Sequence, residues 1–429
     1  MEKAPEGRNG LQNRRLFPFL AGYALGNAGD IFTQVAILWT GLSLSGKAIS
    51  LAGLGGAWTL ATAVMGLVSG PIIDRFNRRN ALFWLHCLLA LLSLGLFAFA
   101  QLGHLRMWHL WAYLVGESMF GVPADLAFDT ILPDLVRKDR LVRINGLLQS
   151  WGMTDNLIEA AISGVVLALW GPAPLFLFNG LMYLFGAAGA LFVPVSAGIA
   201  DPKPKDGGWR PWRDLRLTAR YVVRERLLRR DVLLGIAGSL IFAPLFFMAP
   251  LVSSALEMGS EGYGFLQSLT LGGVLAGSLL ATSIGTRWPK VKVWVGGLIL
   301  YGVGFLILGI LVHASFAFAS FAAFIVFFLF GVGCTGARVY HATLFQQMLP
   351  STHRGRVFGI SSFVQSLPQP LAIAAAMLFV DRSGVGPVLV ALGGLVVLLA
   401  ATRIALLPMR EQDWVLAAPP QEIDPAVPG

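Results

Sequence analysis

Long apolar runs, separated by short polar segments, cover most of the 429-residue chain. A run of about 20 apolar residues is long enough to cross a bilayer as an α-helix. The spacing of the runs predicts twelve such helices in two groups of six. We expect the first group at 16–41, 48–73, 80–102, 107–132, 145–170 and 174–195, and the second at 232–256, 262–286, 291–312, 315–345, 357–380 and 385–408.

The composition supports this interpretation, because 56% of the residues are hydrophobic and only 13% are charged. Soluble domains carry about a quarter charged residues. The 50 glycines suit close helix packing in a membrane. Residues 1–15 are polar and contain no small-residue cleavage site, so we expect the first apolar run to be a retained helix and not a signal peptide.

The basic residues predict the orientation of the chain. Lysine and arginine concentrate in cytoplasmic loops of membrane proteins. With both termini cytoplasmic, 28 of the 32 basic residues fall inside, and only Lys47, Arg106 and Arg382 fall in outer loops. The net charge of +9 is therefore a topology signal, and no soluble basic domain that could bind nucleic acid is present. We expect a multi-pass protein of the cell (inner) membrane.

Two halves and a linker make up the expected domain organisation. Leu132-Pro133 in the first half recurs as Leu349-Pro350 in the second, which is typical of a duplicated transporter fold. Within the linker, the stretch from Trp212 to Arg230 is either a basic amphipathic helix on the cytoplasmic leaflet or a plain solvated connector. The predicted units are an N-terminal bundle at 1–200, the linker at 201–231, a C-terminal bundle at 232–410 and a disordered cytoplasmic tail at 411–429.

Several ionisable residues lie inside the apolar runs. A charged group at bilayer depth costs about 2.5–3.5 kcal/mol on insertion scales, so it usually serves a transport pathway. The alternative for each is a structural pair or a side chain that reaches the membrane edge. In the second half we expect Arg338, followed by His341, to be the single deep charge. The candidates for proton coupling or substrate binding are Asn27, Asp30, Glu117, Asp125, Asp155, Glu159, Arg338 and His341.

A charged loop between the second and third runs carries a motif. It reads Gly70-Pro71-Ile72-Ile73-Asp74-Arg75-Phe76-Asn77-Arg78-Arg79. Asp74 can meet the positive end of a helix dipole, and the arginines can hold carboxylates or lipid phosphates. Gly70 lets the helix end approach a neighbour closely. We predict a conformational latch formed by Gly70, Asp74, Arg75, Arg78 and Arg79.

This loop resembles the signature of the major facilitator superfamily, an all-α membrane fold of twelve helices in two pseudo-symmetric halves. Gly29-Asp30, the stretch 132–136 and the stretch 354–359 are similar to exporters related to macrolide and enterobactin efflux proteins. The resemblance implies that spans one, four, seven and ten line a central cavity, which makes Asp30, Glu117, Asp125 and Arg338 candidates for its walls.

The sequence also departs from the family pattern. The Gly-Pro of the exporter motif in span five is replaced by Glu159-Ala160, and Gly164 is the glycine that remains. Glu117 stands where the family signature in span four has arginine. These changes place acid where the family often has none, and they weaken a simple proton-antiport assignment.

We therefore expect a secondary active exporter of small amphipathic, drug-like molecules, working by alternating access and coupled to protons, as in multidrug efflux by antiport. A first alternative is a lysophospholipid or siderophore carrier in which Arg338 binds an anionic head group. A second is a membrane-embedded enzyme, but the six histidines are scattered without metal spacing and no nucleotide-binding loop is present. The expected partners are a small-molecule substrate, protons and membrane lipids, with no metal, cofactor or nucleic acid, and the protein is expected to be a monomer.

Overall fold

The computed structural model describes residues 8–73, 76–136, 138–193, 224–284, 290–313, 318–348, 361 and 363–406. Helices fill almost all of these ranges, and no strand occurs in them. The first bundle contains α1 (Arg8–Gly26), α2 (Asp30–Ser45), α3 (Ile49–Ile73), α4 (Arg78–Gln101), α5 (Met107–Leu135), α6 (Lys138–Trp170) and α7 (Ala173–Ala190). The second contains α9 (Arg226–Phe246), α10 (Met248–Ala255), α11 (Gly259–Ile284), α12 (Lys290–His313), α13 (Ala319–Met348), α15 (Gln369–Ser383) and α16 (Val385–Leu406).

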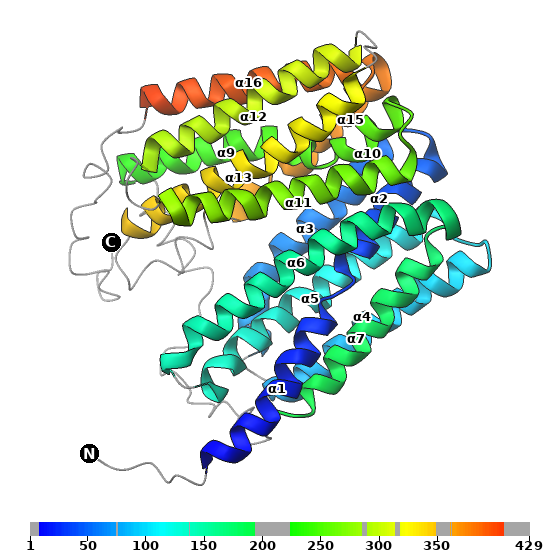
Figure 1. The fold of residues 1–429 in the computed structure, drawn as a ribbon, viewed down its shortest axis with the longest axis vertical. Coiled ribbons are helices and arrows are strands. Elements are labelled where there is room, and N and C mark those ends of the chain that lie inside the picture. Colours follow the sequence, from blue (N-terminus) through cyan, green and yellow to red (C-terminus); the bar gives the residue numbers. More distant parts are fainter. Residues whose placement is uncertain are drawn as a thin grey trace, which may run out of the picture.

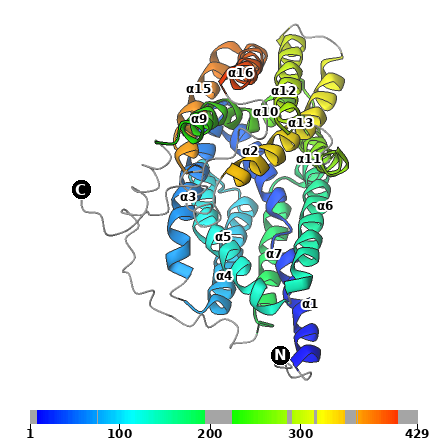
Figure 2. The same ribbon diagram turned by 90° about the vertical axis from the view of Figure 1, so that its left-hand side faces the viewer.

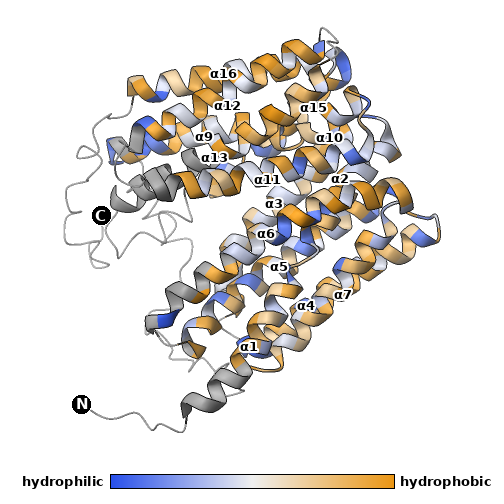
Figure 3. Ribbon diagram, viewed as in Figure 1, coloured by the Kyte–Doolittle hydropathy of each residue, from blue (hydrophilic) through white to orange (hydrophobic). Residues whose placement is uncertain are grey.

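Eight of the described helical segments are long and apolar enough to cross a membrane, and α9 with α10 forms a ninth, bent by 41°. Pro250 in α10 explains this bend, since it lacks the N–H that would bond to the carbonyl of Phe246. Figure 3 shows hydrophobic colour along most of α4 and α7 in one bundle and of α16 in the other. Large apolar side chains such as Leu91 on α4 and Phe321 on α13 stay two-thirds exposed, at 67% and 68%. Lipid is the solvent that suits such a surface.

The first predicted span is not one continuous helix. α1 ends at Gly26 and α2 begins at Asp30, and between them Gly29 adopts a left-handed backbone with φ of 111°. An L-residue other than glycine is strained in this conformation. The expectation of an unbroken helix at 16–41 was wrong because apolar periodicity does not reveal a single left-handed residue.

Span seven begins earlier than expected. The sequence assigned residues up to 231 to the linker, but α9 starts at Arg226. The proposed amphipathic helix ending at Arg230 falls largely outside the described residues, as does the predicted tail at 411–429. The division into domains at 200 and 231 stays a prediction.

The two bundles meet along two pairs of helices. α3 packs against α15, and α6 packs against α11. The bundles come together near α2 and α10, and they diverge toward the ends that hold the start of α1 and the end of α16 (Figure 1). Figure 2 shows α11 next to α6 from a second direction.

Glycine permits the closest approach between bundles. A Cβ added to Gly164 on α6 would lie 2.6 Å from the carbonyl oxygen of Ser260 and 3.0 Å from the Cα of Gly264. A Cβ on Gly55 of α3 would lie 2.5 Å from the ring of Phe247. These positions leave no room for a side chain, so the glycines set the distance between the halves in this conformation.

Candidate transport site

A cavity of about 230 Å³ lies where the bundles meet. Its walls come from α2, α3, α5 and α7 of the first bundle and from the end of α9 in the second. Within the described part of the chain, no lysine or arginine lines it. The described walls of the cavity are therefore acidic and apolar.

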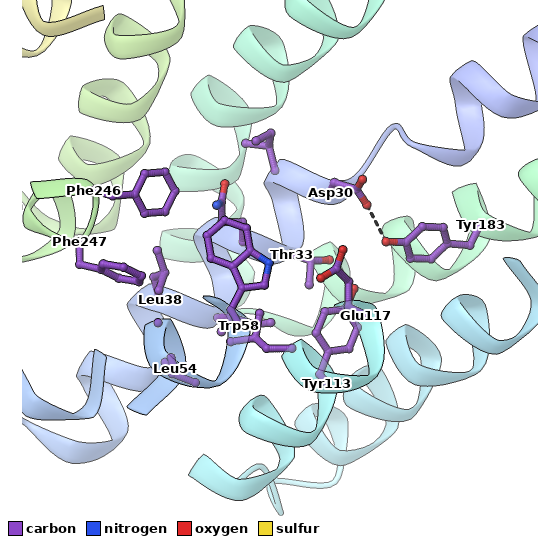
Figure 4. Close-up of a pocket in the computed structure, with 15 residues that line it drawn as sticks. Asp30, Thr33, Leu38, Leu54, Trp58, Tyr113, Glu117, Tyr183, Phe246 and Phe247 are labelled. Atoms are coloured by element: carbon purple, nitrogen blue, oxygen red, sulfur yellow. Dashed lines mark hydrogen bonds between the residues drawn. The ribbon is translucent and has the colours of Figure 1, made fainter. Parts of the chain in front are cut away.

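Asp30 and Glu117 supply the acidic wall (Figure 4). Asp30 is the first residue of α2, and its Oδ1 accepts a hydrogen bond of 2.6 Å from the hydroxyl of Tyr183 on α7. Glu117 projects from α5, where Gly121 makes room for it, since a Cβ there would lie 3.2 Å from Glu117 Oε1. The structure thus brings together two of the acids that the sequence singled out, from spans one and four.

Three buried polar residues support this wall. Asn179 is completely buried, and its side-chain amide donates to Thr33 Oγ1 at 2.7 Å and to Tyr113 Oη at 3.1 Å. Tyr113 and Thr33 both line the cavity. The sequence pattern does not single out Tyr113, Asn179 or Tyr183. The signal that could have found the last two is their spacing of one helical turn within an otherwise apolar run.

The opposite wall is aromatic. Phe246 and Phe247 enter the cavity from the second bundle and face Trp58 of α3 (Figure 4). The ring centroids of Trp58 and Phe246 are 5.9 Å apart. Trp151 on α6 does not line this cavity and is 47% exposed.

Glu159 does not line the cavity but closes the break in the first span. Its Oε1 accepts from the N–H of Gly29, and its Oε2 accepts from the N–H groups of Ile31 at 3.1 Å and Phe32 at 3.4 Å. A helix start leaves such N–H groups without intrahelical partners, and a carboxylate there also meets the positive end of the helix dipole. Asp155 lies one turn earlier on α6, next to Glu159.

Two further candidates lie outside the cavity lining. Asn27 sits in the break between α1 and α2. Asp125 on α5 accepts a hydrogen bond of 3.0 Å from the hydroxyl of Tyr23, whose ring stacks on Phe128 with centroids 3.4 Å apart. Asp125 therefore joins α5 to α1 in this conformation.

The second half holds two buried charged residues that the sequence pattern does not single out. Arg338 and His341 belong to α13, but their side chains lie outside the described residues. Arg403, which the sequence analysis counted as a cytoplasmic topology charge, is only 6% exposed on α16, and Asp231 on α9 is completely buried. The sequence does not single out these two buried charges, because an apolar run that reaches the membrane edge does not show which way its last turn faces. The expectation that Arg338 is the single charge at bilayer depth stays a prediction.

The predicted latch is described in part. Asp74 and Arg75 lie outside the described residues. Among the described residues, no heavy atom lies within 4 Å of a Cβ added to Gly70, and the expected close approach to a neighbouring helix stays a prediction.

The two remaining latch arginines hold backbone carbonyls at the ends of other helices. Arg78 Nη1 donates to the carbonyl of Thr130 on α5 at 3.4 Å, and Arg79 Nη2 donates to that of Leu191, just after α7, at 3.1 Å. Asn77 caps the helix on which both arginines stand, accepting from the N–H of Asn80 at 3.2 Å. The loop thus ties the ends of α4, α5 and α7 together.

Two bundles of apolar helices around a central cavity define a multi-pass membrane transporter. The model of the family described as "Transmembrane secretion effector" matches residues 17–366. The chain belongs to this family of the major facilitator superfamily, in the branch that includes macrolide efflux proteins. It is a secondary transporter and not an enzyme.

Curated relatives and solved structures agree with this assignment. Macrolide efflux protein A of Streptococcus pyogenes is 21% identical over 393 residues, covering 90% of this chain and 94% of that protein. The MFS-type transporter YvqJ of Bacillus subtilis is 24% identical over 88% of this chain and 89% of its own. The nucleoside transporter NupG has a TM-score of 0.65 at 12% identity, over 92% of this chain and 99% of its own. The xylose transporter XylE of E. coli in its inward open conformation has a TM-score of 0.62 at 14% identity, over 93% of this chain and 96% of its own. The structural likenesses support the twelve-helix fold.

Proposed function

We propose that the protein exports small amphipathic molecules by alternating access and that proton entry drives the export. The observation that carries this proposal is the cavity between the bundles, with Asp30 and Glu117 on one wall and aromatic rings on the other. Such a cavity suits a molecule with an apolar body and a cationic group. The relatives named macrolide efflux protein A support the direction of transport.

Proton coupling would work by competition at the acidic wall. A carboxylate in a low-dielectric site binds a proton more readily than one in water. A proton on Asp30 or Glu117 removes the charge that attracts a cationic substrate, so proton binding and substrate binding oppose each other. This opposition is the coupling that an antiporter needs, because a ligand shifts an equilibrium only by its differential affinity.

The arrangement of the bundles supports alternating access. They touch through α3 with α15 and α6 with α11, and they diverge at the ends that hold the start of α1 and the end of α16. If both termini are cytoplasmic, as the basic loops predict, this conformation is open to the cytoplasm. We expect the protein to act as a monomer surrounded by lipid, because both bundles that line the central cavity belong to the same chain.

The test is transport by purified protein in proteoliposomes with an imposed proton gradient. A panel of cationic, neutral and anionic amphiphiles of similar size is offered, and wild-type protein is expected to move the cationic members against their gradient. Asp30→Asn or Glu117→Gln should abolish gradient-driven accumulation and leave binding measurable. Asp129→Asn is the matched control, because this exposed acid on α5 does not line the cavity. Normal pH dependence in both cavity variants would refute proton coupling through this wall.

A further inference from the structure

A second cavity of about 360 Å³ lies inside the C-terminal bundle. α9, α12, α13 and α16 contribute to its walls. It adjoins the central cavity, because Phe246 lines both. Its lining combines aromatic rings with glycines and a few polar groups, and the rings of Tyr301 and Phe330 stack with centroids 4.3 Å apart.

Arg403 brings a buried guanidinium group to this cavity. It is 94% buried, and its Cζ lies 4.3 Å from the ring centroid of Trp294, a contact that suits a cation over an aromatic face. Its Nη2 donates to the carbonyl of Leu234 at 3.2 Å. Its Nε and Nη1 have no hydrogen-bond partner within the part of the chain that the structure describes.

The unused donors are the significant feature. Buried polar groups are nearly always hydrogen-bonded, so an orphaned pair in a native site calls for an explanation. Asp231 on α9 acts electrostatically on the guanidinium and offsets part of the cost of burying a cation. However, no hydrogen bond joins Asp231 to either unused donor. Nη1 therefore keeps N–H groups that the described part of the protein does not use, and the guanidinium can still donate to an acceptor oxygen of a ligand.

We propose that this cavity is a subsite for the oxyanion end, a carboxylate or phosphate, of an aromatic or amphipathic substrate, with Arg403 as the residue that binds it. The inference rests on the proposed function, because the subsite would hold one part of the exported molecule. The acids of the central cavity and Arg403 lie on two sides of Phe246. A molecule that reaches past this ring would place its cationic group near Asp30 and its oxyanion at Arg403. Zwitterionic amphiphiles fit both subsites.

The glycine at position 238 offers an independent way to block the subsite. A Cβ added there would lie 3.6 Å from Arg403 Nη2 and 3.7 Å from the ring of Phe242, which is ordinary contact. The methyl groups of valine would extend beyond this point into the cavity. Gly238→Val therefore fills the space beside the guanidinium and leaves the charge in place. Gly296→Val on α12 is the matched control, because a Cβ there meets open space.

The experiment measures equilibrium binding to full-length protein in phosphatidylcholine nanodiscs, without a proton gradient. The probes are tritiated 2-naphthoate and its neutral amide, 2-naphthamide. We expect wild-type protein to prefer the carboxylate. Arg403→Gln and Gly238→Val should each weaken naphthoate binding by about ten- to a hundredfold, as expected for a lost charge-assisted hydrogen bond, and Arg403→Lys should restore part of it. Arg230→Gln, which removes a basic residue from the same end of the bundle, should bind as wild type does.

A competition arm distinguishes the sources of the oxyanion. If lysophosphatidic acid displaces tritiated naphthoate at a lower concentration than unlabelled naphthoate does, a lipid phosphate is the ligand. The reverse order indicates a soluble carboxylate. Equal binding of acid and amide, or unchanged naphthoate binding in Gly238→Val and in folded Arg403→Gln, would overturn the proposal and leave Arg403 a structural partner of Trp294. Because the assay needs no gradient, loss of transport with intact selective binding would count against the export proposal alone.

Discussion

Glu159 shows how one carboxylate can hold a broken span together. The first span passes through the membrane as two helices, and the N–H groups at the start of α2 would face a medium without water. Unsatisfied backbone groups cost several kcal/mol each in hydrocarbon. Glu159 accepts hydrogen bonds from three of these groups and comes from another helix, α6. This role explains why the position holds an acid where the family motif has glycine.

Replacing Glu159 should therefore destabilise the protein. Glu159→Ala removes all three hydrogen bonds and leaves their donors buried, so we expect a loss of about 1.5–3 kcal/mol. Glu159→Gln keeps one acceptor oxygen, so its Tm should lie between that of Glu159→Ala and that of wild type. Tryptophan fluorescence melting in detergent measures the effect. Glu261→Gln, at an exposed position on α11, should leave Tm unchanged. Wild-type Tm in Glu159→Ala would mean that the carboxylate does not stabilise the break.

At the scale of helices, small residues and helix ends hold the bundles together on one side of the central cavity. Gly164 and Gly264 bring α6 and α11 into backbone contact. At the start of α3, Asp381 from the end of α15 accepts hydrogen bonds from the N–H groups of Ala48 at 2.7 Å and Ile49 at 3.0 Å. Both contacts cross between the bundles, so both must break when the transporter opens on this side.

The glycine contact can be tested by adding volume. Gly164→Val would push side-chain atoms into Ser260 and Gly264, and overpacking of this kind costs about 1–3 kcal/mol. The penalty applies to the conformation described here, so the variant should shift the population toward the opposite state. Distances between spin labels on α3 and α15 would report the shift. Gly152→Val on the same helix places its side chain in open space and should not change the distances. A shift of equal size in this control would refute the explanation.

The contact of Asp381 predicts a second, smaller shift. Loss of a capping carboxylate costs about 0.5–2 kcal/mol, and here the lost energy belongs to the contact between bundles. Asp381→Ala should therefore raise the fraction of molecules open on the side of this contact, measured by the distances between spin labels on α3 and α15. Arg382→Gln, one residue further on, is the control. Unchanged distances in Asp381→Ala would show that the cap forms without favouring closure.

For the whole molecule, the distribution of basic residues predicts which side of the membrane each end occupies. Lys47 and Phe76 flank the two ends of α3 and are both exposed. In intact cells, a membrane-impermeant maleimide should label Lys47→Cys, whereas Phe76→Cys should react only after permeabilisation. The cysteine-free background is Cys87→Ala with Cys334→Ala. The opposite pattern would invert the topology and with it the inferred direction of opening.

The sequence alone determined the fold of this protein. Twelve apolar runs, few charges and one-sided basic loops leave helical spans as the only way to satisfy the backbone in lipid. The sequence also singled out Asp30 and Glu117, because ionisable residues stand out against an apolar run. Both line the central cavity. These properties depend on composition and on spacing along the chain, which a sequence displays directly.

Only the tertiary structure decided what each charged group touches. Glu159 and Asp30 look alike in sequence, yet one caps a helix and the other faces the cavity, because their surroundings come from distant helices. Tyr183 and Asn179 gained roles only through partners more than 60 positions away. Arg403 was hidden in the last turn of a span, where the sequence cannot show whether a side chain faces lipid, water or a neighbouring helix. The packing of the helices makes that choice, since an apolar run fixes the position of a helix in the membrane but not its rotation about its own axis.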